Sequence, residues 1–109
     1  MSETPANPWA GEVSVTINGA PHLCKLTLGT LAELEAALGA DSLVALVQRF
    51  EAQQFSSRDV MALIVAGLRG GGWTGSADDL RTAEIAGGPV GAARVAATLL
   101  ARAFGPSGT

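Results

Sequence analysis

The 109-residue sequence is poor in charge, in cysteine and in histidine. Charged residues make up 16% of the chain, below the ~25% of an ordinary globular protein, whereas apolar residues make up 48%. This composition excludes a chain that is mainly disordered and predicts one packed domain. When a domain of this size folds, about a third of the surface exposed in the unfolded chain stays exposed to solvent. We therefore expect some apolar surface that contacts a partner.

The shortage of cysteine and histidine limits the chemistry. A single cysteine, Cys24, excludes an internal disulfide, and with a single histidine, His22, no Cys/His metal cluster can form. We interpret Cys24 as a small core residue and His22 as a polar strand residue, because neither has a visible activating partner. Asp78 and Asp79 are adjacent, so on a helix they do not face one another. The sequence predicts no catalytic residue, no cofactor and no metal, and it is typical of a reducing, intracellular compartment.

Basic residues and long apolar runs are also missing. Seven Lys and Arg oppose ten Asp and Glu, a net charge of −3, which gives no basic stripe for direct nucleic-acid binding. The longest apolar run, residues 60–68, is nine residues long, against ~20 for a membrane span. The first residues carry no basic or apolar signal-peptide pattern. We therefore expect a soluble, cytoplasmic protein that does not bind membranes.

The N-terminal half begins with a hairpin pattern. Apolar and polar residues alternate over residues 12–17, which predicts a half-buried strand. Asn18-Gly19 indicates a type I′ turn, because both central residues of that turn need positive φ. A return strand is predicted over residues 22–28.

From Gly29 the apolar spacing becomes helical. Thr30 and Glu33 match a capping box, so the first helix is predicted to start there. A second, amphipathic helix is predicted to begin at Asp41 or Ser42.

Three more helices complete the pattern. Ser56 or Ser57 is expected to cap the third helix, whose residues 60–68 are apolar on all sides and should lie at the centre of the fold. A short fourth helix follows Ser76, and a fifth covers about residues 89–104. The predicted fold is α+β, an N-terminal β-hairpin packed on a bundle of four or five short helices.

This pattern predicts a single domain with loose ends. Residues 1–10 are rich in proline and read as a flexible N-terminal arm, and residues 105–109 read as a disordered tail. The α+β domain is predicted to cover residues 11–104.

Residues 70–75 match the spacing G-x-G-x-x-G of dinucleotide-binding loops. That loop must follow a strand, whereas this one follows a predicted helix. A connector between helices is the favoured interpretation, and a small-molecule-binding regulator or enzyme rests on this loop alone.

Three aromatic residues lie where the patterns do not require burial: Trp9 in the arm, Phe55 before the third helix and Trp73 in the glycine loop. Exposed aromatics are typical anchors of protein interfaces, so these are the candidate partner-binding residues. The alternative is that the tryptophans cover an edge of their own core.

Five segments in a fixed order carry a family resemblance: residues 11–13, 26–35, 42–46, 66–72 and 99–105. Together they resemble the small tail protein encoded in gene transfer agents and related siphophage-like prophages of alphaproteobacteria. Members of that family are labelled tail tube protein or tail assembly chaperone. The resemblance covers about residues 7–105 and brings no catalytic residues with it.

The resemblance implies a role in assembling a phage-like particle. A tube subunit of the usual type needs a β-sandwich that closes into rings, whereas this sequence offers two convincing strands. We therefore expect a non-enzymatic tail assembly chaperone that binds the tape measure protein, with other tail proteins as further partners. The alternative is a tail tube or tail-completion subunit that stays in the particle. The resemblance leaves self-association open.

Overall fold

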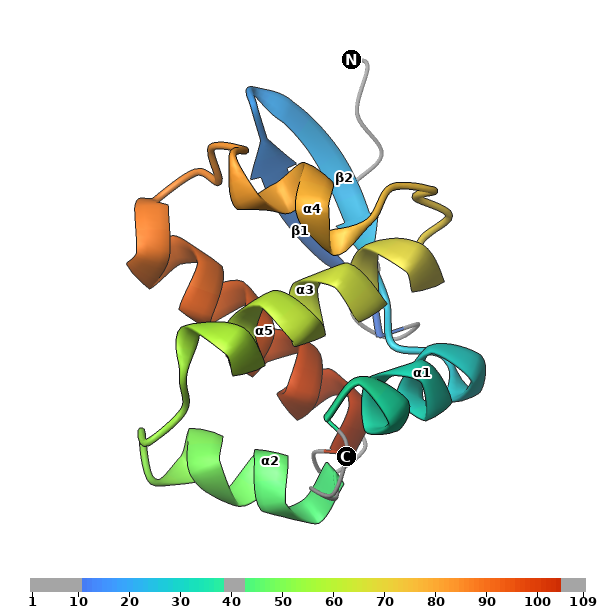
Figure 1. Ribbon diagram of the computed structural model, residues 1–109, viewed down its shortest axis with the longest axis vertical. Helices are drawn as coiled ribbons and strands as arrows, with labels where there is room; N and C mark the ends of the chain where they lie inside the picture. Colours follow the sequence, from blue (N-terminus) through green and yellow to red (C-terminus); the bar gives the residue numbers. More distant parts are fainter. Residues whose placement is uncertain (1–10, 39–42, 105–109) are drawn as a thin grey trace.

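The computed structural model describes residues 11–38 and 43–104, which form a β-hairpin followed by five helices (Figure 1). The elements in order are β1 (Val13–Ile17), β2 (Ala20–Cys24), α1 (Leu28–Leu38), α2 (Leu43–Glu51), α3 (Ser57–Gly70), α4 (Ala77–Arg81) and α5 (Gly88–Phe104). This architecture confirms the α+β class. The predicted arm, residues 1–10, and the predicted tail, residues 105–109, lie outside the described residues.

The hairpin has the turn that its sequence predicts. Asn18 and Gly19 have φ angles of 51° and 82°, the left-handed conformations of a type I′ turn. The two strands are antiparallel, with Val13 opposite Cys24 at the open end. Every second residue of β1, from Val13 to Ile17, is buried, so one face of the hairpin enters the core.

The tip of the hairpin is fixed to the connector between α4 and α5. The Asn18 main-chain N–H donates to the Glu84 carbonyl oxygen at 2.7 Å, and the Glu84 N–H donates to Asn18 Oδ1 at 2.9 Å. Ile17 and Ile85 form an isolated antiparallel bridge on the side of β1 away from β2. The connector thus adds a short third segment to the two-stranded sheet.

The second strand is shorter than predicted. We expected strand over residues 22–28, but α1 already begins at Leu28. Thr27 Oγ1 accepts from the Thr30 N–H at 3.1 Å, and Thr30 Oγ1 accepts from the Thr27 N–H at 2.8 Å. These reciprocal bonds cap the helix one turn earlier than the predicted Thr30–Glu33 box, which is wrong.

Helix α3 lies at the centre of the fold, as predicted (Figure 1). It contributes to two hydrophobic clusters. The first, with the hairpin, α4 and α5, includes Val15, Ile64, Leu80 and Leu99. The second, with α1, α2 and α5, includes Leu34, Leu46, Leu63 and Leu100. Because α3 belongs to both, its burial joins the hairpin to the α1–α2 part of the molecule.

The later helices start where the sequence indicates. Ser56 is the N-cap of α3 and Ser76 that of α4. Helix α5 includes Pro89 in its first turn, which suits a residue without an N–H. The predicted start of the second helix, Asp41 or Ser42, lies outside the described residues.

Candidate functional site

The outer side of α3 carries two shallow apolar grooves that meet at Met61. The first groove lies between α3, α4 and the start of α5 and has a volume of about 370 Å³. Buried Ile64 and Leu80 form its floor, Val60 and Met61 line its α3 side, and Pro89 lines the α5 side. The packing of α3, α4 and α5 therefore leaves an open apolar groove beside the central helix.

The second groove lies between α1 and α3 and has a volume of about 410 Å³. Leu34 lines it from α1, and Met61 and Val65 line it from α3. Arg58 and Arg69 also line it, and the spacing 58, 61, 65, 69 places these four side chains on one face of α3. Met61 is thus the ridge between the two grooves, which together we call the Met61 surface.

Phe55 lines the first groove from the connector before α3. Its ring stacks on Phe50, with ring centroids 4.3 Å apart and an interplanar angle of 7°. Gln53 has a φ of 57°, and the Gln54 N–H donates to the Arg49 carbonyl oxygen at 2.8 Å, which closes the end of α2. The tight turn and the stacking hold Phe55 beside the groove.

A part-buried ion pair fixes this connector to α3. Arg49 Nε and Nη2 donate to the two carboxylate oxygens of Asp59, each at 2.9 Å. The Ser56 N–H also donates to Asp59 Oδ2 at 2.9 Å. Burial raises the pKa of Asp59, but the bonds from Arg49 and Ser56 outweigh burial and hold this pKa below its ordinary value. The charged carboxylate therefore caps α3 and anchors the end of α2 at once.

The structure places Phe55 and Trp73, two of the predicted aromatic residues, apart from each other. Trp73 follows α3 and Phe55 precedes it, so the 14 residues of α3, about 20 Å of helix, separate them. Trp73 is half-buried and packs against the hairpin-side cluster. Trp9 lies outside the described residues. Of the two described candidates, Phe55 lines the Met61 surface and Trp73 does not.

The glycines after α3 have a packing explanation. A Cβ on Gly70 would overlap the Lys25 carbonyl oxygen, and a Cβ on Gly71 would overlap the Leu23 carbonyl oxygen. The end of α3 therefore passes directly against β2 and the chain that follows it. Gly72 has a φ of 104°, and a Cβ on Gly75 would overlap the Trp73 ring. Backbone conformation and packing therefore account for the three glycines of the G-x-G-x-x-G spacing without a nucleotide.

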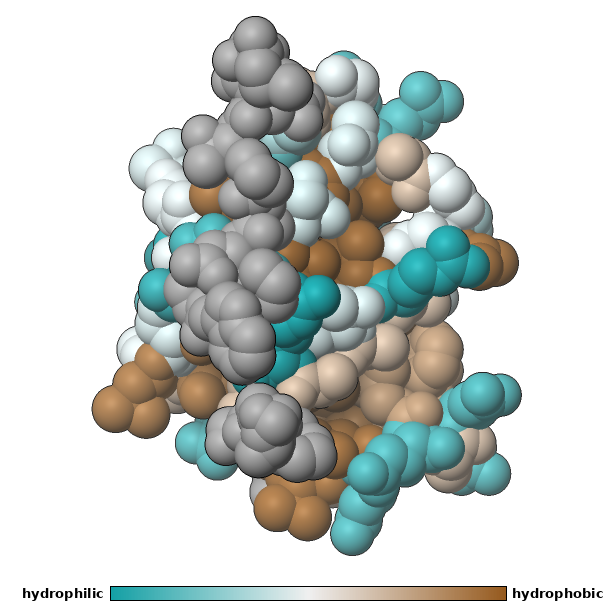
Figure 2. Space-filling model, turned by 180° about the vertical axis from the view of Figure 1, so that it is seen from behind, coloured by the Kyte–Doolittle hydropathy of each residue, from teal (hydrophilic) through white to brown (hydrophobic). Residues whose placement is uncertain are grey.

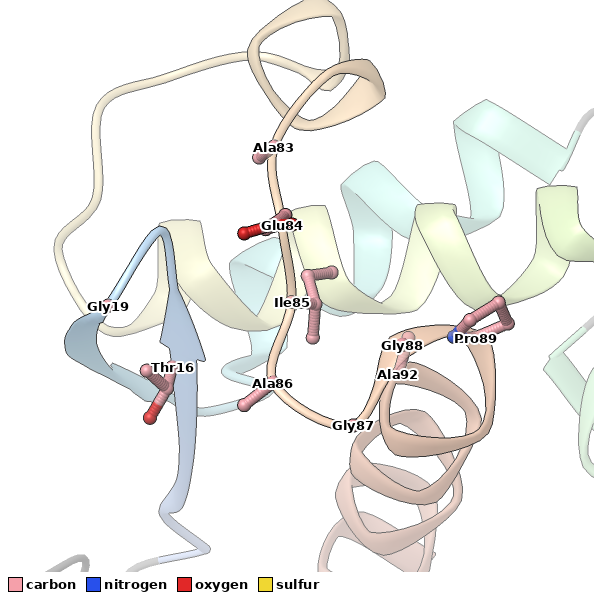
Figure 3. A pocket seen from close by; sticks show the side chains of 10 residues that line it. All are labelled: Thr16, Gly19, Ala83, Glu84, Ile85, Ala86, Gly87, Gly88, Pro89 and Ala92. Atoms are coloured by element: carbon pink, nitrogen blue, oxygen red, sulfur yellow. The ribbon is translucent and has the colours of Figure 1, made fainter.

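A wider hollow of about 620 Å³ lies beside the connector into α5 (Figure 3). Glycines and alanines make up much of its lining, with polar side chains from Thr16 and Glu84. Figure 3 shows the Glu84 and Ile85 side chains on opposite sides of the connector. Glu84 is the one ionisable side chain in this lining, so the hollow offers no pair of groups for acid–base catalysis.

Burial, a helix cap and an exposed ion pair explain the titratable residues Cys24, Asp79 and Asp78 without a catalytic role. Cys24 is fully buried, and burial raises the pKa of its thiol to about 12, so the thiol is protonated and unreactive. Asp79 accepts from the Ser76 N–H at 2.9 Å, and Asp78 forms an exposed ion pair with Arg81 at 3.5 Å. Within the described ranges, no group of three or more His, Cys, Asp and Glu could hold a metal ion.

Two parts of this site were missed by sequence reasoning. The spacing of Ser56 and Asp59 signals the helix cap, but nothing in the pattern indicates that Arg49 turns back to the same carboxylate. Met61 belongs to the run of residues 60–68, which reads as buried on all sides, yet its side chain is only half-buried. An unbroken apolar run does not tell which residue stays open to solvent.

Fold and site define a small α+β protein with an apolar surface beside its central helix that is suited to contact with another chain. None of the helices in the described part of the chain is long and apolar enough to cross a membrane. The chain belongs to the family described as "Phage tail tube protein, GTA-gp10", which matches residues 10–106. This match confirms the resemblance to gene transfer agent tail proteins, and the protein is a tail protein of that phage-like kind. No curated protein and no solved structure matched the chain.

Proposed function

We propose that this tail protein is a non-enzymatic assembly chaperone that binds apolar helices of the tape measure protein before the tail tube forms. The observation that carries the proposal is the Met61 surface, where two apolar grooves adjoin on the central helix. Grooves of this kind accept amphipathic helices, whose apolar residues recur every three or four positions. Other tail proteins are proposed as further partners, and the cytoplasm as the place of action.

The side chains of this surface suit a partner of variable sequence. Met61 is unbranched and adaptable, so it can adjust to different apolar side chains in either groove. Phe55 offers a rigid aromatic ring, held by stacking on Phe50, as an anchor at one end. A bound helix that crosses Met61 covers apolar side chains on both sides of α3.

The family description favours a second candidate, a tail tube or tail-completion subunit that stays in the particle. A tube of the usual type has a continuous β-lined wall built from many strands. The described residues contribute one two-stranded sheet and the single bridge from the connector. This small β content supports the chaperone over the tube subunit.

The test is binding of the full chain to a soluble helical segment of the tape measure protein, measured by calorimetry. Met61→Ala and Phe55→Ala are each expected to weaken binding by about 1 to 3 kcal/mol, as interface anchors do. Val44→Ala is the matched control, because Val44 is 65% exposed on α2 and lines neither groove. Equal affinities for all four proteins would contradict the assignment of this surface.

Trp9 and Trp73 remain proposed as additional partner contacts. Trp73→Ala is expected to weaken binding by about 1 to 3 kcal/mol if the indole touches the partner. Because the Trp73 ring packs against the hairpin-side cluster, the melting temperature must be recorded with the affinity. A destabilised variant that binds normally while folded would assign Trp73 to the core alone.

A further inference from the structure

Three helices carry large apolar side chains that the described chain leaves in solvent, among them Val44 on α2, and α1 and α5 carry the other three. Leu28 at the start of α1 is 86% exposed, and Val90 and Phe104 at the two ends of α5 are 67% and 46% exposed. Figure 2 views the molecule from behind, the side on which α5 lies, and shows apolar side chains gathered there. Exposed side chains of this size point to contact with another chain.

Four exposed apolar residues of α5 and half-buried Ala93 form one continuous stripe. Their spacing of three or four residues puts them on a single helix face: Val90, Ala93, Ala97, Ala101 and Phe104. Arg94 lies at the border of the stripe, is exposed, and makes no ion pair with any described residue. Helix α5 contains no acidic residue, so this face is apolar and positively charged.

The outer face of α1 has the complementary character. Leu28, Ala32, Glu35 and Ala36 are exposed, and their spacing puts them on one face of the helix. Glu35 makes no ion pair with the described part of the chain, and the charged residues of α1 are both glutamates. This face is apolar and negatively charged.

We propose that α1 of one copy of this protein docks on α5 of a second copy, with the two helices antiparallel. A single register aligns both the alanines and the charges. It places Leu28 opposite Ala101, Ala32 opposite Ala97, Glu35 opposite Arg94 and Ala36 opposite Ala93 of the other copy. A parallel alignment that keeps Glu35 opposite Arg94 places Ala36 against half-buried Val95 and loses the alanine matches.

Alanines at the centre let two helices approach closely, while Leu28 and Phe104 both lie at the end of the contact where α1 begins and α5 ends. The contact is heterologous, because it joins two different faces, α1 of one copy and α5 of the other. In a pair of copies, one α5 face and one α1 face stay free to bind further copies. Copies therefore associate head to tail. Ala93 also lines the first groove of the Met61 surface, whereas the other residues of this contact line neither groove. The contact uses neither Met61 nor Phe55, so its test is separate from that of the chaperone role.

The test is sedimentation equilibrium of the full chain over a range of concentrations. The wild-type chain is expected to associate, and Glu35→Arg and Arg94→Glu are each expected to weaken association by about tenfold, because like charges then face each other. Mixing the two variants in equal amounts is expected to restore association, since every contact between unlike copies again pairs one arginine with one glutamate. Both positions are exposed, and circular dichroism checks the fold of each variant.

Glu51→Arg is the matched control, because Glu51 is exposed on α2, away from both faces, and the charge change is the same as at Glu35. This variant is expected to associate like the wild-type chain. A wild-type chain that stays monomeric at its highest soluble concentration would overturn the proposal. So would single variants that associate normally, or a mixture of the two that fails to recover.

Discussion

The main-chain N–H of Lys25 donates a hydrogen bond of 2.8 Å to the carbonyl oxygen of Gly67. This bond joins the end of the hairpin to the body of α3, and it needs a residue without a side chain. A Cβ on Gly67 would lie 2.7 Å from Leu99 Cδ1 and 3.1 Å from the Cβ of Cys24. The position of α3, and with it the Met61 surface, therefore depends on glycines that let the backbones meet.

A matched pair of glycine substitutions tests this dependence. Gly70→Ala is expected to lower the free energy of unfolding by about 1 to 3 kcal/mol, because the new Cβ overlaps main-chain atoms that cannot move freely. Gly29→Ala, in the first turn of α1, meets only Thr27 Oγ1 at 3.9 Å and is expected to be neutral or stabilising by up to about 1 kcal/mol. Urea denaturation measures both. A loss at Gly29 as large as at Gly70 would argue against the packing account.

Asp59→Asn tests the part-buried ion pair that fixes Phe55. The variant is expected to lose about 1 to 3 kcal/mol of unfolding free energy at neutral pH, because the two charge-assisted hydrogen bonds between Arg49 and the Asp59 carboxylate are lost. Asp78→Asn is the control, since its ion pair with Arg81 is exposed and contributes little. Chemical denaturation of the two variants at pH 7 gives the comparison, and equal losses would contradict a special role for Asp59.

The Arg49–Asp59 ion pair also makes the free energy of unfolding depend on pH, in a direction that follows from the pKa of Asp59. The folded-state pKa of Asp59 is lower than its unfolded-state pKa of ~3.9. The ionised carboxylate therefore makes its full contribution to the free energy of unfolding at pH values above the unfolded-state pKa. This contribution to stability is lost as the pH falls through the folded-state pKa of Asp59. The difference in stability between wild type and Asp59→Asn should therefore shrink below about pH 4. A difference that stays constant to pH 2 would show that the charge of Asp59 is not responsible.

Cys24 should behave as an inert core residue. Because its thiol has a pKa of about 12 in the folded protein, almost no thiolate exists at pH 8. A thiol reagent is expected to label the native protein only as fast as it unfolds, and to label the denatured protein at once. Rapid labelling under native conditions would show that the cysteine is accessible.

Gln53 holds a left-handed conformation that glycine adopts at lower energy. Gln53→Gly is expected to raise the free energy of unfolding by about 0.5 to 1 kcal/mol. Gln54→Gly, one residue later and without a positive φ, is expected to be neutral or destabilising. Thermal unfolding of the two variants separates the effect of φ from the general effect of a glycine in the connector.

The sequence predicts the parts of the fold that local physics controls. The Asn18-Gly19 turn, the serine caps and the central position of α3 follow from turn chemistry, capping and an apolar run. The end of β2 does not, because residues 22–28 keep a strand-like alternation that the Thr27–Thr30 cap overrides. Two threonines three residues apart are a weak signal until the helix they cap is known.

The candidate site is less predictable, because it is made by elements distant in sequence. Phe55 could be proposed as an aromatic residue in an unpatterned connector, but its place beside a groove depends on α5 packing across α3. Met61 lies inside a strongly apolar segment, where the sequence gives no sign of which side stays open. Tertiary packing decides which side chains of an apolar segment stay exposed, and a single sequence does not show that packing directly.

We propose that this tail protein acts during assembly and does not remain in the particle as a tube subunit. Quantitative mass spectrometry of purified particles tests it directly, by counting copies of this chain relative to the tail proteins and the tape measure protein. The account predicts that the chain is found with the tape measure protein in the cell extract and is nearly absent from finished particles. A copy number in finished tails equal to that of a structural tail protein would contradict it.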